Sequence, residues 1–212
     1  MKTRIFNLII IDESGSMEVI KREAINGVNE SIQSIRKAQA KHEEQEHYVS
    51  VVSFNEEIKE ICNCVAANEV KELTNEEYCP NSCTALYDAM GMSLNALRPK
   101  VAEDDKVVVT IVTDGEENAS KEYNDKAIKA LVDELKEKGW VFAYIGANQD
   151  VEKVATKISI TNTLSFHATS VGTASMNKKL ATARQRLFNS IAEDNFSSET
   201  GNTSFFDFDE ED

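Results

Sequence analysis

Residues 7–18 read NLIIIDESGSME and join a run of aliphatic side chains to a polar loop. An unbroken aliphatic run of this length is typical of a strand that is covered on both faces of a parallel sheet. Asp12, Ser14 and Ser16 then place oxygen-bearing side chains at alternate positions of the loop. Gly15 between them can adopt a positive φ, which would let the loop fold over an ion.

This stretch also has a purely structural interpretation. Asp12 and Ser14 are residue types that form turns, and Ser16 could cap the helix that follows. From residues 7–18 alone, both interpretations stay open.

The rest of the chain alternates short strands with helices. Strands are predicted from short β-branched or aromatic runs at Ile5–Ile11, Tyr48–Phe54, Ile58–Val65, Val107–Val112, Val141–Ile145 and Thr163–Phe166. Helical apolar spacing is found at residues 25–35, 86–97, 128–135 and 176–187. The short connection before Ile58 predicts a hairpin and therefore an antiparallel edge strand. The alternation predicts a doubly wound α/β sheet, mostly parallel, with helices on both faces.

Length and composition predict one folded unit followed by a tail. A chain of 212 residues can bury a single core. We expect a domain over residues 1–192 and a disordered acidic tail over residues 193–212, where helical spacing ends. Phe205, Phe206 and Phe208 of this tail either dock on a partner or are incidental to a solubilising end.

Charge and hydropathy narrow the choice of partners. The formal net charge is −14, which repels phosphate backbones and anionic lipids, so we expect no nucleic-acid or membrane partner. The first apolar run is short, ends at Asp12 and lacks a cleavage site, and no run approaches the ~18 residues of a spanning helix. We expect a cytoplasmic protein whose four cysteines are thiols.

Two carboxylates are predicted to meet at the carboxyl edge of the sheet. Asp12 follows the first strand, and Asp114 follows the strand at Val107–Val112. Ligands of doubly wound sheets bind at this edge, where the strand order reverses. Two neighbouring carboxylates repel each other unless a cation lies between them, and Mg²⁺ prefers such oxygen ligands.

Three segments together resemble the von Willebrand factor A (vWA) domain family. DESGSM at 12–17 is similar to the Asp-x-Ser-x-Ser motif of this family. NSCTALYDAM at 81–90 resembles the segment in which the family has a threonine in a loop before a helix, which corresponds to Thr84. VTDGEEN at 112–118 resembles the third part, an aspartate after a buried strand, which corresponds to Asp114. The resemblance implies a metal-ion-dependent adhesion site (MIDAS) made of Asp12, Ser14, Ser16, Thr84 and Asp114. It implies Mg²⁺, with Mn²⁺ or Ca²⁺ as alternatives, and a protein partner whose Asp or Glu completes the coordination shell.

The resemblance is nearest to small stand-alone vWA proteins of bacteria and phages. It departs from many relatives at Cys83, where they have Gly before the threonine. It also implies a binding adaptor, with no catalytic residue. A metal-assisted hydrolase using the same site is the alternative, although the chain has no P-loop, no dinucleotide fingerprint and no nucleophile elbow. A monomer is favoured.

The cysteines and histidines allow further hypotheses. Cys62-x-Cys64 and Cys79-x₃-Cys83 could together bind zinc, but the first pair is expected to share one strand face as core residues. Cys79 and Cys83 could also form a reversible disulfide beside Thr84.

Residues His42 and His47 are expected to be solvated, and His167 to be structural. Glu116 and Glu117 form either an acidic rim or helix-start charges, and we assign neither as a ligand.

Overall fold

The structure is a computed structural model that describes residues 2–147, 151–167 and 169–207. Its centre is a six-stranded sheet with the order β3-β2-β1-β4-β5-β6. The strands are β1 (Thr3–Asp12), β2 (Gln45–Phe54), β3 (Ile58–Ala66), β4 (Lys106–Thr113), β5 (Trp140–Ala147) and β6 (Thr163–Phe166). All neighbours are parallel except β2 and β3. The predicted doubly wound sheet with one antiparallel edge strand is confirmed.

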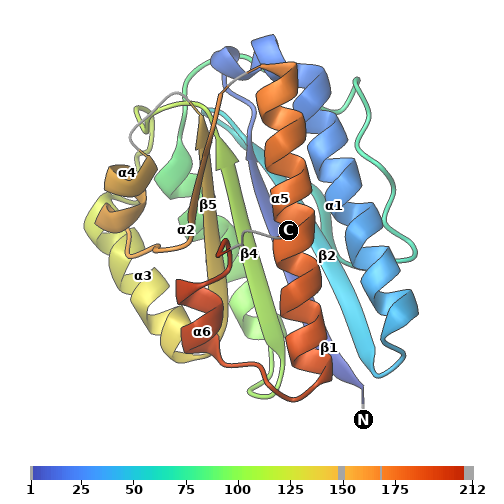
Figure 1. Cartoon of the computed structure of the whole chain (residues 1–212). Coiled ribbons are helices and arrows are strands. Elements are labelled where there is room, and N and C mark those ends of the chain that lie inside the picture. Colours follow the sequence, from blue (N-terminus) through green and yellow to red (C-terminus); the bar gives the residue numbers. More distant parts are fainter. Residues whose placement is uncertain (1, 148–150, 168, 208–212) are drawn as a thin grey trace.

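Helices cover both faces of this sheet (Figure 1). One face carries α1 (Lys21–Lys41) and α5 (Ser170–Ala192), and the other carries α2 (Leu86–Leu97), α3 (Asp125–Glu137) and α4 (Val151–Lys157). Two 3₁₀ helices, η1 (Gly15–Ile20) and η2 (Arg98–Lys100), and α6 (Ser198–Thr203) complete the elements. The four helices predicted from apolar spacing are present. Helix α4 spans 7 residues, too few to show a helical period.

The core has two apolar layers because β1 is covered on both faces. Ile5, Ile9 and Ile11 pack toward α1 and α5. Leu8 and Ile10 pack toward the opposite helices. The aliphatic run that opens the sequence is thus the centre of the fold.

The chain order creates a switch point between β1 and β4. After β1 the chain builds β2 and β3 on one side, then crosses to β4 on the other side of β1. Ile11 pairs with Val112, so the residues that follow each of them leave the sheet side by side. The loops after β1 and β4 diverge there, and this is where ligands bind in such sheets.

The predicted disordered tail is wrong for residues 193–207. Asn202 of α6 is buried, accepts a hydrogen bond from Phe142 N at 3.0 Å and donates to Trp140 O at 2.8 Å. Phe205 is buried in the core layer beneath α5, with Phe206 against it. Helix α6 is short and polar and has no apolar period, since the side chain of Asn202 and the ring of Phe205 hold this segment in place. Apolar spacing therefore could not predict it. Phe208 lies outside the described residues.

Cys62 and Cys64 do not share a strand face as predicted. Val51 pairs with Cys62 while Val49 pairs with Val65, so β3 carries an extra residue opposite Ser50. This bulge, with Cys64 at a φ of 51°, turns the two thiols toward opposite core layers.

All four cysteines are free. Over the described residues, no group of three or more His, Cys, Asp or Glu side chains is placed to hold a metal, so the zinc hypothesis gains no support.

The prediction that His47 is solvated is wrong, because β2 begins before it. His47 is fully buried, its Nε2 lies 2.9 Å from Gln45 Oε1, and its ring meets Phe188 edge to face. His42 is partly buried at the end of α1 beside Glu44. His167 is exposed. Among the described helices, none combines the length and apolar character needed to cross a bilayer.

Acid should destabilise the fold through His47. Burial, aided by the nearby charge of His42, lowers the pKa of His47 from 6.5 to about 4. The unfolded chain therefore binds a proton between pH 6.5 and 4 that the folded chain does not, so stability falls as pH falls through this window. Between pH 7 and 4.5 the free energy of unfolding, measured with urea, should drop by about 2 to 3 kcal/mol from this residue alone. His47→Gln should show a shallower pH dependence, and an unchanged slope would contradict this assignment.

Removing the C-terminal segment should destabilise the domain. A chain ending at residue 196 loses the buried groups of Asn202 and Phe205, and its melting temperature should fall by several degrees. Asn202→Ala alone should cost about 1 to 3 kcal/mol because Phe142 N loses its buried partner. A chain ending at Asp207 is the matched control and should melt like the full chain. If the chain ending at 196 also melts like the full chain, α6 contributes nothing to stability.

Candidate functional site

The five predicted site residues meet at the carboxyl ends of β1 and β4. Asp12 ends β1, Asp114 follows β4, and Ser14 and Ser16 lie at the start of η1. Ser16 Oγ donates to Asp114 Oδ1 at 2.6 Å, and Ser14 Oγ lies 3.2 Å from Ser16 Oγ. Thr84 precedes α2, so its position here depends on the tertiary fold.

Gly115 shows how closely Thr84 approaches the first loop. A Cβ atom placed on Gly115 would lie 2.9 Å from Thr84 Oγ1, 3.5 Å from Asp12 Oδ2 and 3.6 Å from Ser14 Oγ. Three oxygens from two segments, the first loop and the loop before α2, therefore face one small space, which only a glycine at 115 leaves open. The predicted convergence is present, while the role of these groups as metal ligands stays a prediction.

The two carboxyl groups lie in surroundings that oppose their charge. Asp12 is fully buried, and burial raises its pKa, while hydrogen bonds from Thr113 and Ser14 act in the opposite direction. Thr113 Oγ1 donates to Asp12 Oδ2 at 2.5 Å. Burial also raises the pKa of Asp114, which is half-buried. In the described ranges, neither carboxylate forms an ion pair with Lys, Arg or His.

The loop before Thr84 packs on the first loop and fixes its backbone. Tyr78 Oη donates to the carbonyl of Asp12, and Cys79 N donates to the carboxylate of Glu13. Gly15 N donates to Ser82 O at 3.1 Å. The positive φ expected at Gly15 is not found; this glycine instead allows the close approach of the 81–82 backbone. Sequence reasoning missed the parts played by Tyr78 and Glu13, because no local pattern marks a tyrosine so far along the chain, or the middle residue of the motif, as buried at the site.

A third segment fixes Thr84 and the start of α2. Asn118 Oδ1 accepts from Thr84 N at 2.9 Å, and Asn118 N donates to Thr84 O at 3.0 Å. Glu117 accepts from Tyr87 N at 2.9 Å and from two amides of its own loop. The Glu117 carboxylate therefore accepts a hydrogen bond from the first turn of a helix, in agreement with the helix-start hypothesis and not with an acidic rim. The helix is α2, which precedes Glu117 in the sequence. Asp88 in turn accepts from three successive amides at 121–123.

The structural interpretation of the first loop is correct for the turn at Asp12 and Ser14 and wrong for the helix cap at Ser16. Ser14 N donates to Asp12 Oδ1 at 2.7 Å, which is an Asp-initiated turn. Ser16 does not cap a helix, because Ser14 occupies the N-cap position of η1 and no side chain caps it. The hydroxyl of Ser16 is directed to Asp114 instead.

The residues present fit a hard divalent cation. The site offers two carboxylates and three hydroxyls, all oxygen donors of the kind Mg²⁺ and Ca²⁺ prefer. A bound cation would neutralise the buried carboxylate of Asp12 and would occupy the open space at Gly115.

The fold and the site define an α/β domain with an acidic, hydroxyl-rich site at the switch point of its sheet. The family model for the von Willebrand factor type A domain matches residues 8–182. The chain therefore belongs to the von Willebrand factor type A family, whose domains commonly mediate metal-dependent protein interactions. No protein of curated function matches the chain in sequence.

Solved structures share the fold at low sequence identity. A von Willebrand factor type A protein from Catenulispora acidiphila has a TM-score of 0.59 and 14% identity, over 86% of this chain and 43% of that chain. The pilus adhesin SpaC from Lactobacillus rhamnosus GG, in an open conformation, has a TM-score of 0.64 and 12% identity, over 89% of this chain and 30% of that chain. Proximal thread matrix protein 1 from the mussel byssus, with a zinc occupied MIDAS motif, has a TM-score of 0.54 and 14% identity, over 87% of this chain and 46% of that chain. The chain spans less than half of each of these longer chains, and the likeness shows the fold alone.

Thr84 can be tested with a matched pair of variants. Thr84→Val keeps the shape of the side chain and removes its oxygen, whereas Thr84→Ser keeps the oxygen. If Thr84 holds the ion, the rise of melting temperature with Mg²⁺ concentration should shrink strongly in Thr84→Val and persist in Thr84→Ser. Thermal unfolding in a Mg²⁺ series, with EDTA as the zero point, measures this. Equal responses in the two variants would remove Thr84 from the site.

Proposed function

We propose that this chain is a metal-dependent protein-binding module in which Asp12, Ser14, Ser16, Thr84 and Asp114 hold Mg²⁺. An Asp or Glu from a protein partner completes the shell. The observation that carries the proposal is the convergence of oxygens at one point. Those of Asp12, Ser14 and Thr84 face the space beside Gly115, and Ser16 links this loop to Asp114.

The charges of the site residues favour an anionic partner group. When bound, the ion supplies a positive centre that accepts a further oxygen donor. Asp12 and Asp114 offset its charge, while Ser14, Ser16 and Thr84 are neutral. An ion held mainly by neutral oxygens keeps positive character on its open side, so a carboxylate binds there although the chain as a whole carries −14.

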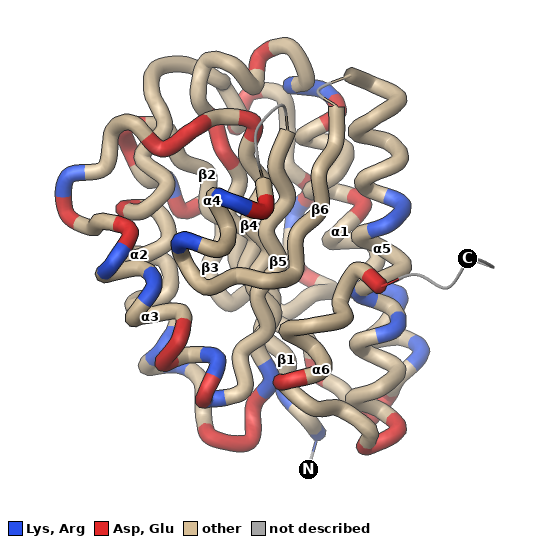
Figure 2. Tube along the Cα trace, turned by 60° about the vertical axis from the view of Figure 1, so that its left-hand side comes forward, with Lys and Arg blue, Asp and Glu red and all other residues tan. Residues whose placement is uncertain are grey.

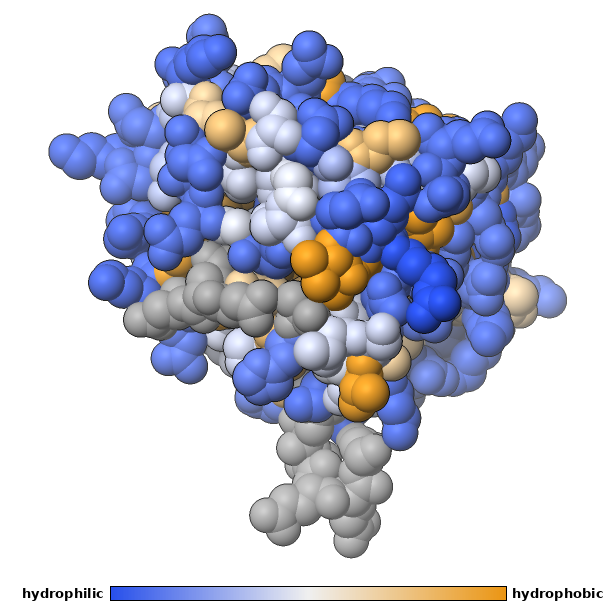
Figure 3. Space-filling model, turned by 90° about the horizontal axis from the view of Figure 1, so that it is seen from above, coloured by the Kyte–Doolittle hydropathy of each residue, from blue (hydrophilic) through white to orange (hydrophobic). Residues whose placement is uncertain are grey.

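The site is accessible to a macromolecule. Ser16 is exposed and Asp114 is half-exposed, while Asp12 and Ser14 lie beneath them. Figure 3 shows the face at the carboxyl ends of the strands, which is mainly hydrophilic with small apolar spots. A polar face around a buried charge suits a partner that contributes one acidic side chain.

The distribution of charge gives no support to nucleic-acid binding. In Figure 2, Lys and Arg are scattered over the face shown, and Asp and Glu lie among them on α3, without one large basic patch in that view. Phosphate backbones need clustered cations to offset a net charge of −14.

Turnover is the less favoured function for this site. The hydrogen-bond partners of Asp12 and Asp114 in the described part of the chain are hydroxyls and backbone amides. No histidine or cysteine is among them, and His167 makes no bond to either aspartate. The proposal is therefore a binding protein and not an enzyme.

The proposal extends to the ion and the setting. Mn²⁺ or Ca²⁺ could replace Mg²⁺, and the zinc reported in the MIDAS of the mussel protein is consistent with a site class that accepts several divalent ions. Free thiols, with Cys79 and Cys83 exposed, support a cytoplasmic location. The motif resemblance supports a bacterial or phage origin and a monomeric adaptor.

Mn²⁺ can report whether the bound ion accepts a carboxylate. Enhancement of water-proton relaxation by Mn²⁺ bound to the chain measures the water molecules on the ion. A capped glutamate peptide should lower this enhancement by displacing water, and the matched glutamine peptide should not. Equal effects of the two peptides would contradict carboxylate recognition.

Ser14→Ala should separate binding from folding. It removes one buried hydroxyl and no apolar contact, so in EDTA the chain should stay folded, with a melting temperature lowered by about 2 to 4 °C for the lost hydrogen bond. Partner capture should be lost in Ser14→Ala and in EDTA, and be retained by the original chain in Mg²⁺. A partner held equally in all three conditions would locate the binding surface elsewhere on the domain.

A further inference from the structure

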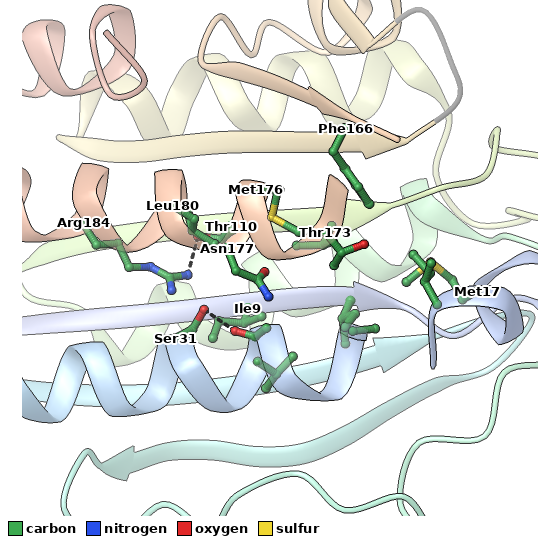
Figure 4. Close-up of a pocket in the computed structure, with 16 residues that line it drawn as sticks. Ile9, Met17, Ser31, Thr110, Phe166, Thr173, Met176, Asn177, Leu180 and Arg184 are labelled. Carbon is green, nitrogen blue, oxygen red and sulfur yellow. Dashed lines mark hydrogen bonds between the residues drawn. The ribbon is translucent and has the colours of Figure 1, made fainter. Parts of the chain in front are cut away.

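A small cavity lies between α1, α5 and the sheet (Figure 4). Its wall is mainly apolar, with Ile9, Met17, Met176 and Leu180 among the residues that line it. Its volume is about 20 Å³. A cavity of this size has room for about one particle of the size of a water molecule.

Arg184 lines this apolar cavity and is incompletely paired. The side chain extends from α5 toward β4 in Figure 4 and is 1% exposed. Its Nη2 donates to Thr110 Oγ1 at 3.0 Å. Its Nε and Nη1 are buried without a hydrogen-bond partner. A guanidinium has five N–H donors, so most of the donor capacity of Arg184 is unused.

No carboxylate balances this charge. The residues that line the cavity include no Asp or Glu, and Arg184 forms no ion pair with any residue in the ranges described. Burial lowers the pKa of Arg184 to about 10, which still leaves it protonated at neutral pH. A buried cation without a counter-charge is strongly destabilising, so natural folds pair such groups.

The other polar groups at the cavity are neutral. Ser31 Oγ donates to Gly27 O at 2.8 Å. The Asn177 amide packs directly on α1, since a Cβ on Gly27 would lie 2.6 Å from Asn177 Oδ1. Ser31, Asn177 and Thr110 are each at least nine-tenths buried. They can orient a small ligand but cannot offset the positive charge.

We infer that this cavity binds a monovalent anion of halide size, with chloride as the probe, and that Arg184 Nε and Nη1 are its donors. The charge requires an anion, and the volume excludes polyatomic anions such as sulfate. The apolar walls favour a weakly hydrated ion. Bound there, the ion neutralises Arg184 and stabilises the packing of α5 on α1 and the sheet. The site is separate from the cluster at Asp12 and Asp114 and does not depend on the proposed function.

Thermal unfolding tests the site in the full chain. The melting temperature is measured in sodium chloride and in sodium gluconate at equal ionic strength, with EDTA present so that the metal site does not contribute. It should rise in chloride by about 3 to 6 °C when the ion is tenfold above its Kd. Arg184→Met should remove the response. Arg186→Met, which removes a partly exposed charge two residues away on α5, should keep it.

Bromide provides a direct test with the unaltered chain, which decides the matter even if Arg184→Met does not fold. Anomalous scattering from crystals soaked in sodium bromide should show a peak beside the Arg184 guanidinium. Equal melting temperatures in chloride and gluconate, or a response that persists in Arg184→Met, would overturn the inference. Density without a bromide signal would assign the space to a water molecule and would also overturn it.

Discussion

The burial of Asp12 at the end of the central strand is the constraint on which the functional architecture depends. Its carboxylate is fully buried, and Asp114 from the neighbouring strand lies in the same cluster of hydrogen bonds. Hydroxyls and backbone amides surround the pair. Such donors reduce the cost of burying negative charge but do not neutralise it. Parallel pairing of β1 with β4 places these two strand ends side by side, and the reversal of strand order leaves the space above them free of a crossing loop. The proposed cation would supply the missing positive charge.

The surrounding loops form a support for this constraint. Residues 78–82 hold the first loop through the Tyr78 hydroxyl, Cys79 N and Ser82 O, and Asn118 holds Thr84. Residues 78–82 lie outside the two segments that contribute the carboxylates, and Asn118 lies at the end of the segment that contributes Asp114. Ligand geometry at the site thus depends on contacts between segments that are far apart in the sequence, which is what a binding site needs if it is to be rigid before its ligand arrives.

Much of the fold could be predicted because its signals are local. The aliphatic runs marked all six strands, and the polar residues at the ends of two of them marked the site. The predictions that were wrong concern segments where a single tertiary contact determines the structure and the local apolar pattern does not. An extra residue opposite Ser50 separates Cys62 from Cys64, a strand longer than its apolar run buries His47, and α6 is held by Asn202 and Phe205 without an apolar stripe. Arg184 carried no signal at all, since an arginine on a helix is ordinarily exposed.

The central claim is that Asp12, Ser14, Ser16, Thr84 and Asp114 hold one divalent cation. Counting bound Mn²⁺ by electron paramagnetic resonance, in the original chain and in Asp114→Ala, tests it most directly, with circular dichroism to confirm that both are folded. We predict one tight site per chain in the original and none in Asp114→Ala. Equal Mn²⁺ binding by the two folded chains would contradict the claim.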